Sequence, residues 1–140
     1  MREVKRALAA AAFVCAAALF GACDDNSTPA RPTPTPKTDT LNGTVNQNGA
    51  NTQTFTASAP GTVTATLTDL KPVDTITVGF SIGTTIGTIC QASLANDAAT
   101  KGAILTATAA SAGTYCVRVY DVGNLTAETP IDFTVTVVHN

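Results

Sequence analysis

The stretch Ala112-Gly-Thr-Tyr-Cys-Val-Arg-Val-Tyr-Asp121 predicts a glycine turn that opens into the central strand of a β-sandwich. Within it, Tyr115, Val117 and Val119 alternate with polar or reactive side chains, so only one register of the strand buries the valines. Turn-forming residues at 121–124 bound the strand on its far side. The stretch therefore specifies a scaffold, and it contains no group of residues with an evident reactive chemistry.

The same alternation of apolar and polar side chains recurs along the rest of the chain. The clearest case is Thr62–Thr68, where Val63, Ala65 and Leu67 point to one side and threonines to the other. Strands are also predicted at 41–45, 52–57, 74–82, 87–92, 103–108 and 131–138, with exposed loops at 96–102 and 121–130. Seven or eight short strands without a helical period predict an all-β fold, an antiparallel β-sandwich.

Length and charge limit what this domain can do. The chain has 140 residues, of which 13% are charged and none is Trp. Once a leader and a tether are set aside, one domain of about 100 residues remains, enough for a single modest core. Without residues 1–22, five basic residues against nine acidic ones leave a net charge near −4. Because no basic stripe is present, nucleic-acid binding is not expected.

The first 22 residues have the organisation of a bacterial secretory leader. Three basic residues among the first six precede an apolar run at 7–20, which is too short for a permanent membrane helix. The run ends in Leu19-Phe-Gly-Ala-Cys23, which resembles the lipobox of bacterial lipoproteins, where the Cys is acylated and becomes the new N-terminus. We expect Cys23 to anchor the chain in a membrane of the bacterial cell envelope, facing the periplasm or the cell surface. The alternative is ordinary cleavage near Ala22 that leaves the Cys23 thiol free.

Residues 23–40 are predicted to form a tether between this anchor and the folded domain at 41–140. Prolines at 29, 32, 34 and 36 alternate with polar residues, which favours a polyproline II spacer with a reach of at most about 50 Å.

Two of the four cysteines remain for the folded domain. One of the others lies in the leader and Cys23 is expected to carry lipid, which leaves Cys90 and Cys116 to pair. A disulfide that closes a loop of this length contributes about 3.5 kcal/mol by the chain-entropy argument. Two separate buried thiols are the alternative, and two Cys without a nearby His or third Cys make a poor zinc site.

Four phrases of the folded part resemble, in order and spacing, the bacterial pre-peptidase C-terminal domain. They are Phe55–Thr68, Asp74–Phe80, Ala112–Tyr120 and Phe133–Val137, and the resemblance covers nearly all of residues 42–138. The resemblance implies a sandwich of jelly-roll type. It also implies a module of exported proteins that is cleaved off, assists secretion or contacts polysaccharide or insoluble substrate. Here a lipid anchor takes the place of the catalytic domain.

Some members of that family bind calcium through acidic residues near the early strands. Asp69 and Asp74 are the nearest candidates in this chain, but they do not form a loop of alternating acids. We therefore expect no metal and no cofactor.

The polar residues do not form a recognisable catalytic arrangement in the sequence. The single His, His139, lies one residue from the C-terminus, where we expect a frayed tail rather than a firmly held base. The carboxylates do not form a motif with glycosidase spacing. The sequence therefore predicts a protein that is not an enzyme.

One polar group is a candidate binding surface: Arg118, Tyr120, Asp121 and Asn124, which lie on or just after the central strand. An Arg beside a phenol can stack on a sugar ring or pair with a carboxylate of a partner. The alternative is structural, with Arg118 paired to Asp121 or to a cross-strand acid and Tyr120 covering the disulfide.

The sequence thus predicts a monomeric, non-catalytic, lipid-anchored module that binds an envelope protein or polysaccharide. Two alternatives remain: an accessory domain or subunit of an exported hydrolase, and a structural surface-coat lipoprotein that self-associates through an exposed strand edge.

Overall fold

The computed structural model describes residues 32–140, which form eight β-strands joined by turns and loops. The leader at 1–22 and Cys23 lie outside the described residues. The strands are β1 (Lys37–Val45), β2 (Ala50–Ala57), β3 (Gly61–Lys71), β4 (Val78–Ile86), β5 (Ile89–Ala99), β6 (Ile104–Ala109), β7 (Gly113–Tyr120) and β8 (Ile131–His139).

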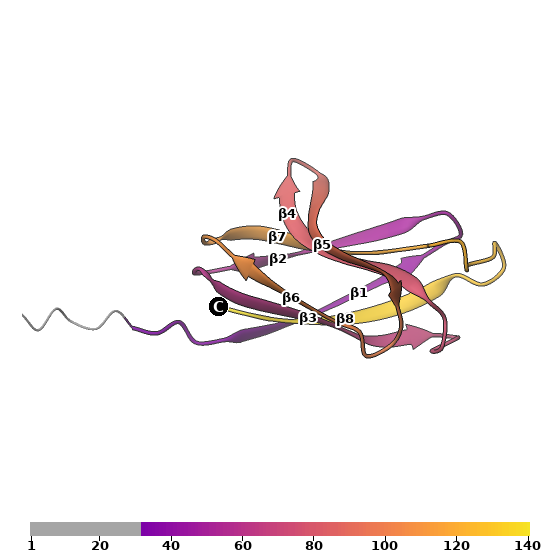
Figure 1. Cartoon of the computed structure of the whole chain (residues 1–140), viewed down its shortest axis with the longest axis horizontal. Coiled ribbons are helices and arrows are strands. Elements are labelled where there is room, and N and C mark those ends of the chain that lie inside the picture. Colours follow the sequence, from indigo (N-terminus) through magenta and orange to yellow (C-terminus); the bar gives the residue numbers. More distant parts are fainter. Residues whose placement is uncertain (1–31) are drawn as a thin grey trace, which may run out of the picture. The chain divides into compact units, whose positions relative to one another are not determined.

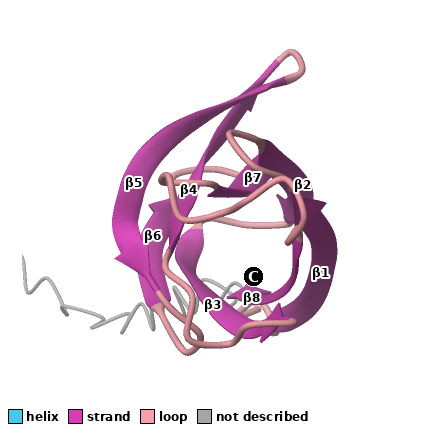
Figure 2. Cartoon of the chain, turned by 90° about the vertical axis from the view of Figure 1, so that its right-hand side faces the viewer, coloured by secondary structure: helices cyan, strands magenta, loops and turns pink. Residues whose placement is uncertain are grey.

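The strands build two antiparallel sheets that pack face to face, as Figures 1 and 2 show. One sheet has the order β1-β8-β3-β6 and the other β2-β7-β4-β5. The predicted all-β antiparallel sandwich is confirmed, with eight strands. The jelly-roll type stays a prediction. The strand order supports it, because β1–β8, β2–β7, β3–β6 and β4–β5 are the pairs of one two-stranded ribbon wrapped into both sheets.

The core lies between the sheets and follows from the alternation in the sequence. In β3, Val63, Ala65 and Leu67 are buried while the threonines between them are partly exposed. The four inward residues of β8 are buried as predicted: Ile131, Phe133, Val135 and Val137. β-Branched and aromatic side chains suit such half-buried strands, and threonine keeps the β-branched shape on the wet face.

The first strand begins earlier than predicted. β1 starts at Lys37, which pairs with His139, so residues 37–40 belong to the sheet and not to the tether. Residues 37–40, Lys-Thr-Asp-Thr, contain no apolar side chain, so the sequence pattern alone indicates a linker there. The backbone pairing with β8 is what orders these residues.

The predicted exposed loop at 96–102 is wrong in its first half, because β5 continues to Ala99. The side chains of β5 are mostly exposed on both faces, so the strand lacks the alternation that a half-buried strand displays. β4 likewise begins at Val78 rather than at residue 74 and continues to Ile86.

The β4–β5 hairpin extends beyond its sheet. The pairing of β4 with β7 ends at Thr84 and Tyr115, whereas the pairing with β5 continues to Ile86 and Ile89. We call residues Thr84–Gln91 the arm, and Figure 1 shows this hairpin protruding upward from the sandwich. Beyond Thr84, the two strands of the arm therefore pair only with each other.

Candidate functional surfaces

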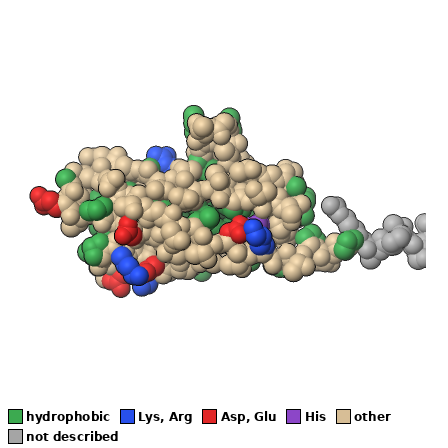
Figure 3. All heavy atoms as spheres, turned by 180° about the vertical axis from the view of Figure 1, so that it is seen from behind, with side chains coloured by type: hydrophobic (Ala, Val, Ile, Leu, Met, Phe, Trp, Pro, Cys, Tyr) green, Lys and Arg blue, Asp and Glu red, His purple; other side chains and the backbone are tan. Residues whose placement is uncertain are grey.

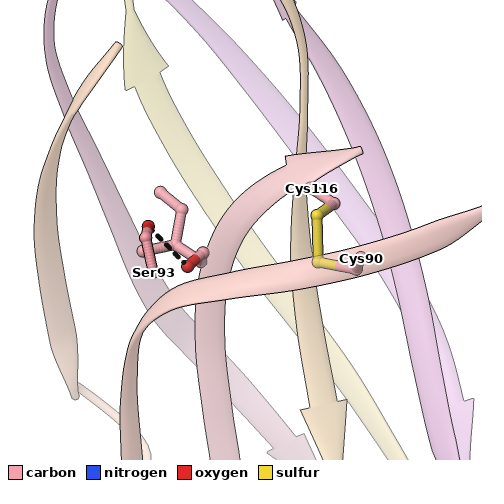
Figure 4. The surroundings of a disulfide bond; sticks show 4 residues. Cys90, Ser93 and Cys116 are labelled. Carbon is pink, nitrogen blue, oxygen red and sulfur yellow. Dashed lines mark hydrogen bonds between the residues drawn. A yellow bond between two sulfur atoms is a disulfide. The ribbon is translucent and has the colours of Figure 1, made fainter. Parts of the chain in front are cut away.

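The Cys90–Cys116 disulfide ties the arm to the sheet, which confirms the predicted pairing. It joins β5 to β7, two strands that are not neighbours because β4 lies between them. The Cα atoms are 5.8 Å apart, and Figure 4 shows the bridge. Cys116 is fully buried.

Gly83 makes this crossing possible. It lies opposite Cys116 on β4, and a Cβ atom there would approach the Gln91 carbonyl carbon to 2.6 Å and the Ala92 Cα to 2.8 Å. These are backbone atoms that cannot turn away, so the β5 backbone comes close to β4 only because residue 83 has no side chain. Beside the crossing, the Ser93 hydroxyl donates a hydrogen bond of 3.2 Å to the Ile82 carbonyl (Figure 4).

Arg118 and Tyr120 lie together on the outer face of the second sheet. The guanidinium carbon of Arg118 is 5.4 Å from the centre of the Tyr120 ring, a cation–π geometry. The Tyr120 hydroxyl donates a hydrogen bond to Asp97 on β5, and this bond and partial burial raise the pKa of Tyr120. The ring packs on Gly79, four residues from Gly83 and therefore about 13 Å along the strand, so it does not cover the disulfide.

Asp121 and Asn124 belong to a separate structure, a clip that closes the loop after β7. One carboxylate oxygen of Asp121 accepts three backbone N–H groups, from Gly123, Asn124 and Leu125, and the other accepts the Asn48 N–H at 2.8 Å. Burial pushes the pKa of Asp121 up, but these four donors outweigh it and the net shift is downward. The Asn124 amide donates to the Thr77 carbonyl at 3.0 Å.

The predicted binding group is thus divided between two places. Arg118 and Tyr120 are on the sheet face, whereas Asp121 and Asn124 hold the loop. The structural alternative, an ion pair of Arg118 with Asp121 or with a cross-strand acid, is wrong. Within residues 32–140 Arg118 forms no salt bridge, and Asp121 accepts backbone N–H groups. The sequence did not point to Asp97 as a partner of Tyr120.

His139 is not part of a frayed tail, so that prediction is also wrong. Its side chain is buried, lies 5.1 Å from the Phe55 ring centre and bonds Asp39 through Nε2 at 2.9 Å. Hydrogen bonds from Lys37 and then from His139 hold the pKa of Asp39 below its ordinary value. The last residue of β8 is thus held by a core aromatic ring and by Asp39 near the start of β1.

A polar trough of about 360 Å³ lies on the outer face of the first sheet, where β1, β8 and β3 run side by side. Its polar lining is Asn42, Thr44, Asp69, Lys71, Asp132 and Thr134. Many of these groups bond one another: the Thr44 hydroxyl donates to Asp132 at 2.6 Å, and the Thr134 hydroxyl to Asn42 at 2.8 Å.

Asp69 is neutralised by two lysines. Lys71 lies at 2.8 Å and Lys101 at 3.1 Å, and their hydrogen bonds lower the pKa of Asp69 to about 2. In residues 32–140, no three His, Cys, Asp or Glu side chains lie together as a metal-binding group.

A second, smaller hollow of about 140 Å³ opens between the two sheets beside the arm. Its lining is mainly apolar and small: Val63, Ile82 and Gly83, Ala107 to Ala110, and Tyr115, with Thr84 and Ser93 at the arm. Figure 3 shows how few charged side chains the visible face carries, and that hydrophobic atoms occupy the tip of the protruding arm.

No helix in the part of the chain from residue 32 onward is both long and apolar enough to cross a membrane. No protein-family model matches the chain, and no curated protein matches it. The resemblance to the pre-peptidase C-terminal domain therefore stays a prediction.

Proposed function

We propose that this chain is a non-catalytic, lipid-anchored module of a bacterial envelope, which holds a β-sandwich away from the membrane and presents it to a partner protein or polysaccharide. The observation that carries the proposal is the order of the N-terminal sequence. A basic and apolar leader ends in Gly-Ala-Cys23, and a proline-rich tether separates that Cys from the first strand at Lys37.

The use of the ionisable groups supports a binding role rather than a catalytic one. Asp39 and His139 join β1 to the end of β8, Asp121 holds a loop, and Asp69 is paired with lysines. Each of these carboxylates has a lowered pKa, whereas a general acid at neutral pH needs a raised one. These side chains are engaged in stabilising the sandwich.

A Cys23→Ala variant of the full chain, expressed in a bacterium, tests the anchor. The native chain is expected in the membrane pellet and the variant in the soluble fraction of the envelope, because the acyl chains supply the attachment. Recovery of both chains in the same fraction would contradict the proposal.

The polysaccharide partner has one specific observation in its favour, the polar trough. Its hydroxyl, amide and carboxylate groups match sugar hydroxyls, which both donate and accept hydrogen bonds. On a glycan array, Asn42→Ala should weaken a signal that the native chain gives, whereas Thr106→Ala, an exposed threonine outside the trough, should not. A glycan signal that survives Asn42→Ala would place polysaccharide binding elsewhere.

The resemblance to the pre-peptidase C-terminal domain favours the alternative of an accessory domain or subunit of an exported hydrolase. Co-purification with a hydrolase activity from envelope extract would support that alternative, and a native chain that pulls down no hydrolase would oppose it. A structural surface-coat lipoprotein is the remaining alternative.

A further inference from the structure

We propose that β5 is a self-association edge, to which a second copy of this chain adds its own β5 in antiparallel orientation. This inference goes beyond the proposed function, because it needs neither the lipid anchor nor an external partner.

The first observation is that β5 is an edge strand that no lysine, arginine or proline protects. It is the last strand of the order β2-β7-β4-β5, so one row of its backbone N–H and C=O groups has no strand partner among residues 32–140. Natural edges are often blunted by lysine, by proline, by β-bulges or by covering elements. β5 contains neither lysine, arginine nor proline, and no charged residue occurs from Val78 to Asn96. Its pairing with β4 is irregular at two places, between Val78 and Phe80 and between Ile82 and Gly83, which leaves regular runs of β5 at 89–92 and 94–96.

The second observation is the apolar face that this edge carries into solvent. Ile86 and Ile89 face each other across the hairpin and are 60% and 69% exposed, and Leu94, opposite Ile82, is 40% exposed. Along β4, Ile86 points to the same side as the core residues Phe80 and Ile82, because successive side chains alternate. Ile89 and Leu94 lie opposite Ile86 and Ile82 on β5, so they point to that side as well. At the arm, apolar side chains on the core-facing side of the sheet are therefore exposed to solvent, because the other sheet does not cover them. The hollow of about 140 Å³ lies beside them.

The charges favour a second copy as the occupant. In a two-fold pairing centred on Leu94, the Ile89 end of one β5 lies beside the Ala99 end of the other. The only charged residue of β5, Asp97, then faces Gln91 of the other copy and not a second Asp97. Such a contact is self-complementary and closes after two copies. The tether does not suit this edge, because residues 24–31 carry two Asp, one Arg and a Pro. A dimer would replace the monomer that we expected from the sequence.

Site-specific photo-crosslinking of the full chain in the bacterial envelope tests the proposal. Two differently tagged copies are expressed together, with a photoreactive phenylalanine analogue at Leu94 or, as a matched control, at Val138. Both side chains are 40% exposed, but Val138 lies on β8 in the interior of the other sheet. We expect a product of twice the chain mass that contains both tags from position 94, and none from position 138.

A charge variant gives a second readout. Ile89→Lys should reduce the crosslink from position 94 at least fivefold, because a lysine at this edge must be desolvated. Ile104→Lys is the control, since Ile104 is 61% exposed on β6 of the other sheet. Equal yields from positions 94 and 138, or no effect of Ile89→Lys, would overturn the inference. Crosslinking of position 94 only to another protein would also overturn it, while leaving the proposed function intact.

Discussion

Reduction of the Cys90–Cys116 disulfide is expected to lower the free energy of unfolding by about 3.5 kcal/mol. The two cysteines are 26 residues apart, and the bridge removes the entropy of closing that loop from the unfolded chain. The native structure gives no reason for a smaller value, because Gly83 leaves room for the β5 backbone that carries Cys90. A loss of this size is a large part of the 5–15 kcal/mol or so that stabilises an ordinary domain.

The measurement is the urea unfolding of a protein of residues 23–140 that carries Cys23→Ser, with and without reductant. Far-UV circular dichroism reports the fraction unfolded. With a urea slope of about 1.5 kcal/mol per molar, reduction should lower the midpoint by about 2 M. The Cys90→Ser chain, which has no bridge to lose, should unfold at the same midpoint in both conditions. A loss below about 1 kcal/mol on reduction would refute the loop-closure reasoning.

Three further predictions concern the parts that hold the arm and the loops. Gly83→Ala should lower the free energy of unfolding in urea by about 2–3 kcal/mol, because the new Cβ meets the backbone at Gln91 and Ala92. Gly113→Ala is the control, since its Cβ meets no atom within 4 Å and should be tolerated. Equal losses for the two variants would show that β5 does not pack tightly against Gly83. Asp121→Ala should lower the free energy of unfolding by about 2–3 kcal/mol, because it leaves the four backbone N–H groups without their charged acceptor. Asp121→Asn should lower it by less. An unchanged urea midpoint for Asp121→Ala would contradict a stabilising role of these hydrogen bonds. The pKa of the Asp69 carboxyl is lowered from 3.8 to about 2, so its contribution to stability is complete above about pH 4 and is lost as the pH falls toward 2. Over this range the free energy of unfolding of Asp69→Asn should therefore fall less steeply with decreasing pH than that of the native chain. An equally steep fall would contradict the stabilising pairing of Asp69 with the two lysines.

The sandwich could be predicted because its core strands have apolar residues on one face only. In β3 and β8 the alternation alone identified the buried residues, since each strand has one wet face. β5 does not follow this rule, because it lies at an edge and is exposed on both faces. The pairing of Lys37 with His139 was equally hidden, because backbone hydrogen bonds leave no mark on side-chain periodicity.

The candidate surfaces were predictable only where one residue type decides the outcome. Counting cysteines was enough to pair Cys90 with Cys116. The need for Gly83 could not be predicted, because it arises only where the β5 backbone passes close to β4 in the folded protein. Asp121 was recognised as a turn residue, yet its bond to Asn48 joins positions 73 residues apart. The polar trough is formed by three strands that are distant in sequence, so no local sequence pattern predicts it.

The intact mass of the native chain purified from envelope membranes tests the account most directly. We predict a mass equal to that of residues 23–140 plus the acyl and glyceryl groups on Cys23, with two hydrogens fewer for the Cys90–Cys116 disulfide. A mature chain with an unmodified Cys23 thiol, or one that retains residues 1–22, would contradict it.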